Sequence, residues 1–154
     1  MDKTIFVGIF VITLFLISGC QNPFDDKNYF PKDAIDCGFI PPIIDKDYNV
    51  EYNGEVKDCF YNAFKNCESA FIGEKHNSME GDYIFQYAFI EEETCRILFF
   101  EDTRQDMYGP REIRKEYCSN ISIMYTRSPM NPNESIKLLM FGPCGQSRGG
   151  QAIY

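Results

Sequence analysis

Residues 53–69 read NGEVKDCFYNAFKNCES, and this stretch decides how the rest of the chain is interpreted. Its apolar residues and cysteines recur at the three- and four-residue spacing of one helix face: Val56, Cys59, Phe60, Ala63, Phe64 and Cys67. Asn53 is a residue type that caps helix amino ends, and Glu55 favours a first turn electrostatically. The pattern predicts an amphipathic helix over 53–69 whose stripe packs into a core, with Lys57 on another face.

Four strands are predicted after this helix, over residues 82–90, 94–101, 117–126 and 135–141. The first two are separated by a short acidic turn and should form an antiparallel hairpin. Sequential strands are usually neighbours in a sheet. The expected fold class is therefore α+β, with one amphipathic helix packed on a four-stranded antiparallel sheet stapled by disulfides.

The first predicted strand is apolar on both of its faces. One face carries Tyr83, Phe85, Tyr87 and Phe89, and the other carries Ile84, Gln86, Ala88 and Ile90. The helix can cover only one of the two, so the other needs a second layer, a ligand or a partner. The four aromatic residues are the candidate partner-binding face.

The amino-terminal residues 1–20 read MDKTIFVGIFVITLFLISGC. The uncharged run 4–18 is shorter than the roughly 20 apolar residues of a membrane span and fits the apolar region of a secretory signal. Ile17-Ser18-Gly19-Cys20 resembles the lipobox of prokaryotic lipoprotein signal peptides. The resemblance implies a signal peptide over 1–19 and a diacylglyceryl group on Cys20, whose acyl chains, such as palmitate, hold a protein at a membrane.

The alternatives to this prediction are an ordinary secretory signal and an uncleaved anchor, with Cys20 incidental in both. Residues 20–36 are polar, acidic and contain two prolines, so they are expected to form a flexible tether after the lipidated cysteine. A single disulfide-bonded domain is then expected over 37–154. The chain would be exported and anchored to the cell membrane or the outer membrane.

With Cys20 set aside, six cysteines remain, and an even number in an exported chain implies disulfides: Cys37, Cys59, Cys67, Cys95, Cys118 and Cys144. Cys59 and Cys67 would lie about 12 Å apart along the helix, too far for a bond. Cys95 and Cys118 would lie at opposite ends of two antiparallel neighbours, which disfavours that pair. A bond between Cys118 and Cys144 is feasible, and the pairing otherwise stays open.

Composition and missing motifs exclude several function classes. The net charge of −8 argues against a nucleic-acid partner, because neutralising phosphates needs clustered Lys and Arg. The lone His76, expected in a polar turn over 73–81, and the absence of C-x-x-C argue against zinc and thioredoxin-like chemistry. Residues 45–51 follow the first half of a calcium loop, but Val50 and Val56 replace its required Gly and Glu. No metal, cofactor or catalytic residue is predicted.

The body of the chain also resembles a group of small exported prokaryotic proteins with no assigned activity. Their pattern is C-F-x-x-A-x-x-x-C, matched by residues 59–67, followed by a sheet with two further cysteines, matched by Cys95 and Cys118. The resemblance covers roughly residues 50–120. It implies a helix-plus-sheet fold and transfers no site residues.

Three functional hypotheses follow from these observations. The first is an envelope lipoprotein that acts as a non-catalytic binding or structural module, with an envelope protein or an apolar ligand as its partner. The second is a carrier of a small apolar ligand, held in a cavity lined by Phe60 and Phe64. The third is an enzyme, which would need a deep polar pocket around His76 or converging carboxylates.

Overall fold

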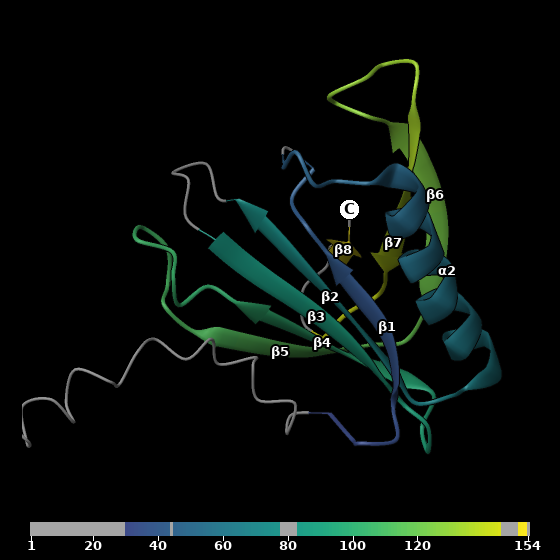
Figure 1. Ribbon diagram of the computed structural model, residues 1–154. Coiled ribbons are helices and arrows are strands. Elements are labelled where there is room, and N and C mark those ends of the chain that lie inside the picture. The colour runs from purple at the N-terminus through teal and green to yellow at the C-terminus, as the bar shows by residue number, and fades with distance from the viewer. Residues whose placement is uncertain (1–29, 44, 78–82, 146–150, 154) are drawn as a thin grey trace, which may run out of the picture. The chain divides into compact units, whose positions relative to one another are not determined.

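The computed structural model describes residues 30–43, 45–77, 83–145 and 151–153. The chain divides into two compact units, Met1–Lys32 and Asp33–Tyr154, and the helix and strands described below belong to the second (Figure 1). The predicted signal peptide, Cys20 and most of the predicted tether lie outside the described residues. The first strand begins at Ile35, within the range predicted as tether.

Helix α2 spans Val50–Asn66 and begins earlier than the sequence pattern predicts. Asn49 is its N-cap, and the Asn49 side chain accepts a hydrogen bond of 2.9 Å from the backbone N–H of Tyr52. Asn53, predicted to be the cap, lies instead inside the helix and is buried. The helix ends at Cys67, which adopts a left-handed backbone conformation and donates its N–H to the carbonyl of Phe64.

No helix within the described ranges is long and apolar enough to cross a membrane.

A five-stranded sheet, here sheet A, has the strand order β1-β2-β3-β4-β5 in the described part of the chain. Its strands are β1 (Ile35–Ile40), β2 (Ala70–Asn77), β3 (Tyr83–Glu91), β4 (Arg96–Asp102) and β5 (Ile113–Cys118). The hairpin of β3 and β4 confirms the predicted antiparallel pair. β1 pairs parallel to β2, so the sheet is mixed, and the prediction of a four-stranded antiparallel sheet is wrong.

A second sheet, here sheet B, contains β6 (Ile121–Arg127), β7 (Ser135–Phe141) and β8 (Gln151–Ile153) in the order β6-β7-β8. Its pairings are antiparallel. The single strand predicted over 117–126 is wrong, because the chain leaves sheet A after Cys118 and enters sheet B at Ile121. Alternation of side chains continues across the link at Ser119 and Asn120, so this two-residue period does not reveal the break.

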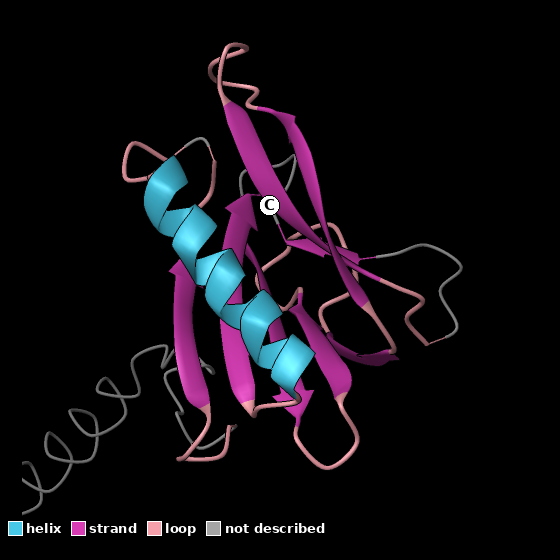
Figure 2. Cartoon of the chain, turned by 90° about the vertical axis from the view of Figure 1, so that its right-hand side faces the viewer, coloured by secondary structure: helices cyan, strands magenta, loops and turns pink. Residues whose placement is uncertain are grey.

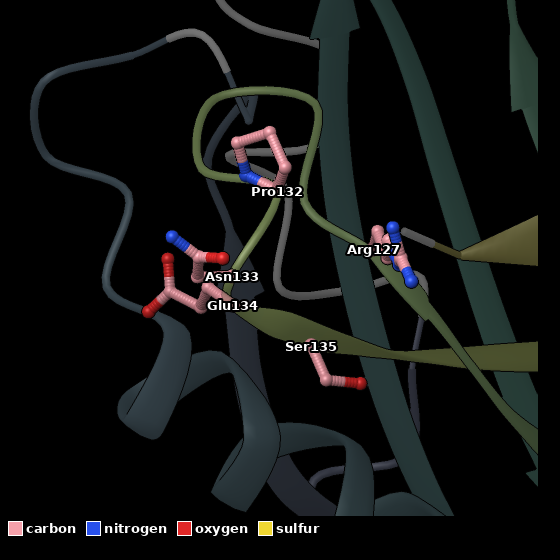
Figure 3. Close-up of a pocket in the computed structure, with 5 residues that line it drawn as sticks. All are labelled: Arg127, Pro132, Asn133, Glu134 and Ser135. Carbon is pink, nitrogen blue, oxygen red and sulfur yellow. The ribbon is translucent and has the colours of Figure 1, made fainter.

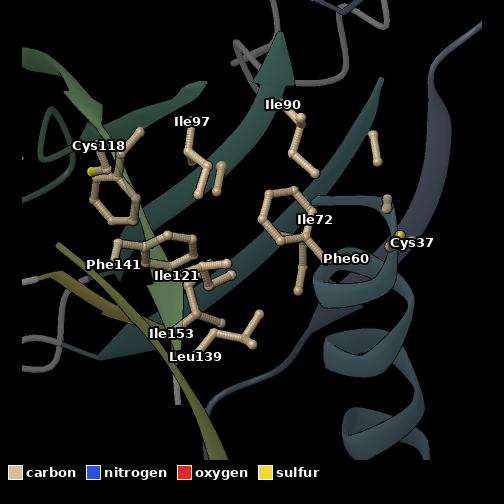
Figure 4. Close-up of a cluster of buried hydrophobic side chains, with 14 of the residues drawn as sticks. Cys37, Phe60, Ile72, Ile90, Ile97, Cys118, Ile121, Leu139, Phe141 and Ile153 are labelled. Atoms are coloured by element: carbon tan, nitrogen blue, oxygen red, sulfur yellow. The ribbon is translucent and has the colours of Figure 1, made fainter. Parts of the chain in front are cut away.

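The core lies between one face of sheet A, here the inner face, and a layer made by helix α2 and sheet B. Figure 2 shows helix α2 lying across the strands, and Figure 4 shows Phe60 of the helix and Phe141 of β7 pointing into the same cluster as Ile72, Ile90 and Ile97 of sheet A. Phe60 and Phe141 meet edge to face, with ring centroids 6.2 Å apart. One helix and two sheets therefore share a single core.

Three disulfides connect these layers: Cys37–Cys59, Cys67–Cys95 and Cys118–Cys144. The first joins β1 to helix α2, and the second joins the end of the helix to the turn before β4. The third joins the end of β5 to the segment that follows β7. The predicted exclusion of a Cys59–Cys67 bond and of a Cys95–Cys118 bond is confirmed. Disulfides of this kind indicate an oxidising, exported environment.

Candidate functional site

The face of sheet A opposite the core, here the outer face, is dominated by aromatic side chains. Strand register and the two-residue alternation of β-strands place the following rings on it: Phe39, Phe71, Tyr83, Phe85, Tyr87, Phe89, Phe100 and Tyr117. The four residues of the predicted candidate face, Tyr83, Phe85, Tyr87 and Phe89, are all among them. Phe39, Phe71, Phe100 and Tyr117 come from the neighbouring strands and were not predicted.

The rings at the margin of the outer face are open to solvent, and the rings at its centre are not. Phe39, Tyr83 and Tyr117 are 39%, 41% and 44% exposed. Phe85 and Tyr87, in the middle of β3, are buried. The Phe39 ring contributes to this burial, because its centroid lies 6.5 Å from that of Phe85 and 6.1 Å from that of Tyr87.

Gly73 makes this packing of Phe39 possible. It lies in β2 opposite Tyr87 and beside Phe39 of β1. A Cβ atom at residue 73 would come within 2.6 Å of the Phe39 ring and 2.9 Å of the Tyr87 ring. The missing side chain therefore leaves the space in which Phe39 lies down on the sheet.

Cationic side chains stack on the rings of the outer face. The Lys75 ammonium nitrogen lies 3.3 Å from the ring centroid of Tyr83, and that of Lys115 lies 5.2 Å from the centroid of Phe100. The Arg96 guanidinium lies 4.4 Å from the centroid of Tyr117. These distances are those of cation–π contacts, so the outer face combines flat apolar rings with positive charge.

Two acidic side chains of β3 and β4 on the outer face each have an arginine partner. Glu91 lies 3.7 Å from Arg96 and also accepts a 2.9 Å hydrogen bond from the Tyr117 hydroxyl. This hydrogen bond and the charge of Glu91 raise the pKa of Tyr117 above its usual value. Asp102 is buried and pairs with Arg104 at 2.8 Å.

A row of polar residues crosses the inner face of sheet A beyond the apolar core. Register aligns Glu74 of β2, Gln86 of β3, Glu101 of β4 and Arg114 of β5. The Gln86 amide donates a 3.1 Å hydrogen bond to Glu101, while its own carbonyl oxygen is buried without a partner among the described residues. Glu74 is 1% exposed. This row was not predicted from the sequence, although Gln86 stands out as the amide in an otherwise apolar strand.

Helix α2 places two further polar residues over this row. Asn53 and Lys57 are each 1% exposed, and neither amide atom of Asn53 has a hydrogen-bond partner in the described part of the chain. Both residues fall on the buried spacing 53, 56, 57, 60 and 63, so the prediction that Lys57 lies on another face of the helix is wrong. A helix face defined by apolar residues alone does not include them, although both stand at the spacing of the buried face.

Lys57 and Lys137 form a reciprocal connection between the helix and sheet B. The Lys57 ammonium donates a 2.8 Å hydrogen bond to the backbone carbonyl of Lys137, and the Lys137 ammonium returns a 2.5 Å bond to Asp58. Burial lowers the pKa of Lys57 to about 8, with the charge of Glu74 opposing the shift and that of Lys137 adding to it. Burial likewise raises the pKa of nearby Tyr48.

His76 does not lie in a turn. It belongs to β2, which covers Ala70–Asn77, so the predicted turn over 73–81 is wrong as far as residue 77, and residues 78–81 lie outside the described ranges. The side chain is half-buried, and burial lowers its pKa while the charge of Glu101 opposes the shift. The strand was missed because its second half is polar, although Glu74 is buried.

An open hollow of about 430 Å³ lies at the β6–β7 loop and is lined by Arg127, Pro132, Asn133, Glu134 and Ser135 (Figure 3). Its lining is polar and contains neither His76 nor Phe60. Phe60 is fully buried and packs against Phe141. The apolar residue expected to line a carrier cavity is thus part of the core.

No protein-family model, no curated protein and no solved structure matches this chain. The resemblance of residues 17–20 to a lipobox and that of residues 50–120 to small exported proteins accordingly stay predictions. The outer face of sheet A is the candidate functional site, because it gathers more aromatic surface and cationic charge than the sheet needs for its own core.

Proposed function

We propose that this chain is an exported, lipid-anchored envelope protein that acts as a non-catalytic binding module through the outer face of sheet A. The observation that carries the proposal is the set of aromatic rings on the face of the sheet opposite the core. A sheet that already packs helix α2 and sheet B on its inner face has no need of the exposed rings of Tyr83 and Tyr117 for its own folding. Exposed aromatic side chains are typical of binding surfaces.

The anchoring part of the proposal is supported by two independent features. The lipobox-like residues 17–20 supply a lipidation site at Cys20, and this modification uses the one cysteine outside the three disulfides. The disulfides themselves suit a chain that matures outside the cytosol.

Intact mass of the protein extracted from native membranes tests the anchoring. The expected mass is that of a chain starting at Cys20 with a diacylglyceryl group, and alkylation of the cysteines should require prior reduction. A chain that keeps residues 1–19, or a Cys20 thiol that alkylates without reduction, would contradict the proposal.

Nitration of tyrosines in intact membranes and in the purified protein tests the binding surface. Tyr83 and Tyr117 should react more slowly in the membranes, because an occupant of the outer face would cover them. Tyr52, Tyr108 and Tyr125, which are 47%, 74% and 65% exposed on other elements, are the internal controls and should react equally in both. Equal reactivity of Tyr83 and Tyr117 in the two preparations would mean that the outer face is empty and would overturn the proposal.

A further inference from the structure

We propose that the occupant of the outer face is an anionic lipid surface, namely the membrane in which a lipid on Cys20 would be embedded. This inference rests on the proposed function, since it identifies the partner of the same face. It is carried by the combination of exposed rings, stacked cations and the distribution of charge over the folded unit.

The side chains at the margin of the outer face have the chemistry of a membrane interface. Tyr83 and Tyr117 each have an apolar ring and a polar hydroxyl, the combination that concentrates at the boundary between acyl chains and headgroups. Lys75 and Arg96 lie over these same rings. A lysine or arginine on an aromatic ring can extend its charged end to a phosphate while its stem and the ring stay in the apolar layer.

Charge complementarity favours anionic lipid over a neutral or cationic partner. The chain as a whole is acidic, with a net charge of −8. On β3 and β4 of the outer face, however, Glu91 and Asp102 are both neutralised by arginine. Lys75 and Lys115 lie on rings of the same face and outnumber its remaining acidic residue, Asp36 of β1, so the face carries a small positive excess in a chain that is acidic overall. Each lysine close to an anionic membrane strengthens binding by roughly fivefold.

The acidic residues of the helix lie on the other side of the sheet. Helix α2 covers the inner face, and its exposed positions include Glu51 and Glu55. An anionic membrane would repel this side and attract the outer face. Attraction of the outer face and repulsion of the helix side therefore favour the same orientation, with the outer face towards the membrane.

The sequence length between the lipid site and the folded unit allows this orientation. Twelve residues lie between Cys20 and Asp33, and the thirteen Cα–Cα steps that join the two residues can span at most about 45 Å. A unit of this size has a radius of gyration of about 14 Å, so any of its faces can reach the membrane. The tether also holds the outer face near the membrane at a high effective concentration, so that a weak docking contact suffices.

A single tryptophan reports the docking directly, because the chain contains none. The full lipidated protein carrying Tyr117→Trp is incorporated into vesicles of phosphatidylglycerol and brominated phosphatidylcholine. We expect the bromine atoms to quench the indole by about half, since its ring would lie at the level of the upper acyl chains. The matched control is Tyr52→Trp on helix α2, which should keep its fluorescence.

Charge reversal tests the electrostatic part. In the Tyr117→Trp background, Lys75→Glu with Lys115→Glu should raise the phosphatidylglycerol fraction needed for half-maximal quenching, and 0.5 M salt should do the same. Lys65→Glu is the control, because Lys65 also stacks on a tyrosine, Tyr61, at 5.7 Å but lies on helix α2. It should leave the quenching unchanged. If the Lys65 variant lost as much quenching as the double variant, the result would contradict docking through the outer face.

The outcomes separate this inference from the proposed function. In one outcome, the variant sediments with the vesicles without quenching of the indole at residue 117, while Tyr117 of the wild-type protein is protected from nitration in native membranes. The occupant of the outer face is then a protein or a glycan. That result overturns lipid docking and leaves the binding module standing. Protein that shows neither quenching nor protection overturns both, and equal quenching of the indoles at residues 117 and 52 overturns docking by one face.

Discussion

At residue 73 a single hydrogen atom takes the place of a side chain, and the arrangement of the outer face depends on it. In Gly73→Ala the new methyl group would overlap the Phe39 and Tyr87 rings. We expect a loss of about 1–3 kcal/mol in the free energy of unfolding, because Phe39 must leave its place on the sheet. Gly54→Ala in helix α2 is the matched control, since a Cβ there meets nothing within 4 Å. Urea unfolding should find the control unchanged or stabilised by up to about 1 kcal/mol.

Lys57 makes the stability of the chain depend on pH in the alkaline range. Its folded-state pKa of about 8 lies below its ordinary value of 10.5, so between these values the unfolded chain holds a proton that the folded chain has released. Stability contributed by this residue therefore rises with pH. Relative to Lys57→Met, the wild-type protein should gain about 2 kcal/mol in its free energy of unfolding between pH 7 and pH 9.5. A difference between the two proteins that does not change with pH would contradict the burial of a titrating lysine.

The control for the pH experiment is Lys65→Met. Lys65 lies on the same helix and is exposed. The difference between the wild-type protein and this variant should stay flat over the same pH range. If the difference in free energy of unfolding from the wild-type protein rose equally with pH for both variants, the pH dependence would not come from the contacts of Lys57 with Glu74 and Lys137.

Among the elements, β1 depends on a covalent bond for its place. It is an edge strand that pairs only with β2 in the described sheet, and Cys37–Cys59 fixes it to helix α2. Replacing both cysteines by alanine should lower the free energy of unfolding by about 2–4 kcal/mol. It should also speed hydrogen exchange of the amides in 35–40. Replacing Cys118 and Cys144 instead should leave the exchange of those amides unchanged relative to the rest of sheet A, and a uniform effect of both pairs would contradict a local role.

The elements that could be predicted from the sequence are those whose periodic apolar residues are also the ones buried in the structure. Helix α2 was predicted from its apolar stripe, and β3, β4 and β7 from alternation or apolar runs. β2 was missed because its second half is polar, and its buried Glu74 belongs to a polar row that only the register of four strands brings together. The switch between sheets at Ser119 and Asn120 was missed because side-chain alternation does not record which sheet a strand joins.

The candidate site was predictable in part for the same reason. Alternation along β3 is sufficient to place Tyr83, Phe85, Tyr87 and Phe89 on one face. Phe39 and Tyr117 come from strands that lie far away in the sequence, and the cations that stack on the rings come from three strands. Such neighbours depend on long-range pairing, which no local pattern specifies.

On the scale of the whole folded unit, the shared core predicts that helix and sheets unfold together. Phe141 of β7 packs on Phe60 of the helix and on Phe99 of β4, with centroids 6.2 Å and 5.5 Å apart. Phe141→Ala should lower the free energy of unfolding by about 3–5 kcal/mol. Circular dichroism of the backbone and of the tyrosines should report one coincident transition in the variant and in the wild-type protein. Two separated transitions would show that sheet B unfolds independently.

The pairing of the cysteines has a consequence for how the chain is made. The six cysteines pair in chain order, the first with the second, the third with the fourth and the fifth with the sixth, at separations of 22, 28 and 26 residues. A polypeptide that crosses a membrane amino end first would present each cysteine to its native partner before a later pair arrives. An oxidase that simply joins thiols in their order of appearance would then yield the native bridges without an isomerase. Lipidation of Cys20 before oxidation would keep this order intact, since it withdraws the first thiol to emerge.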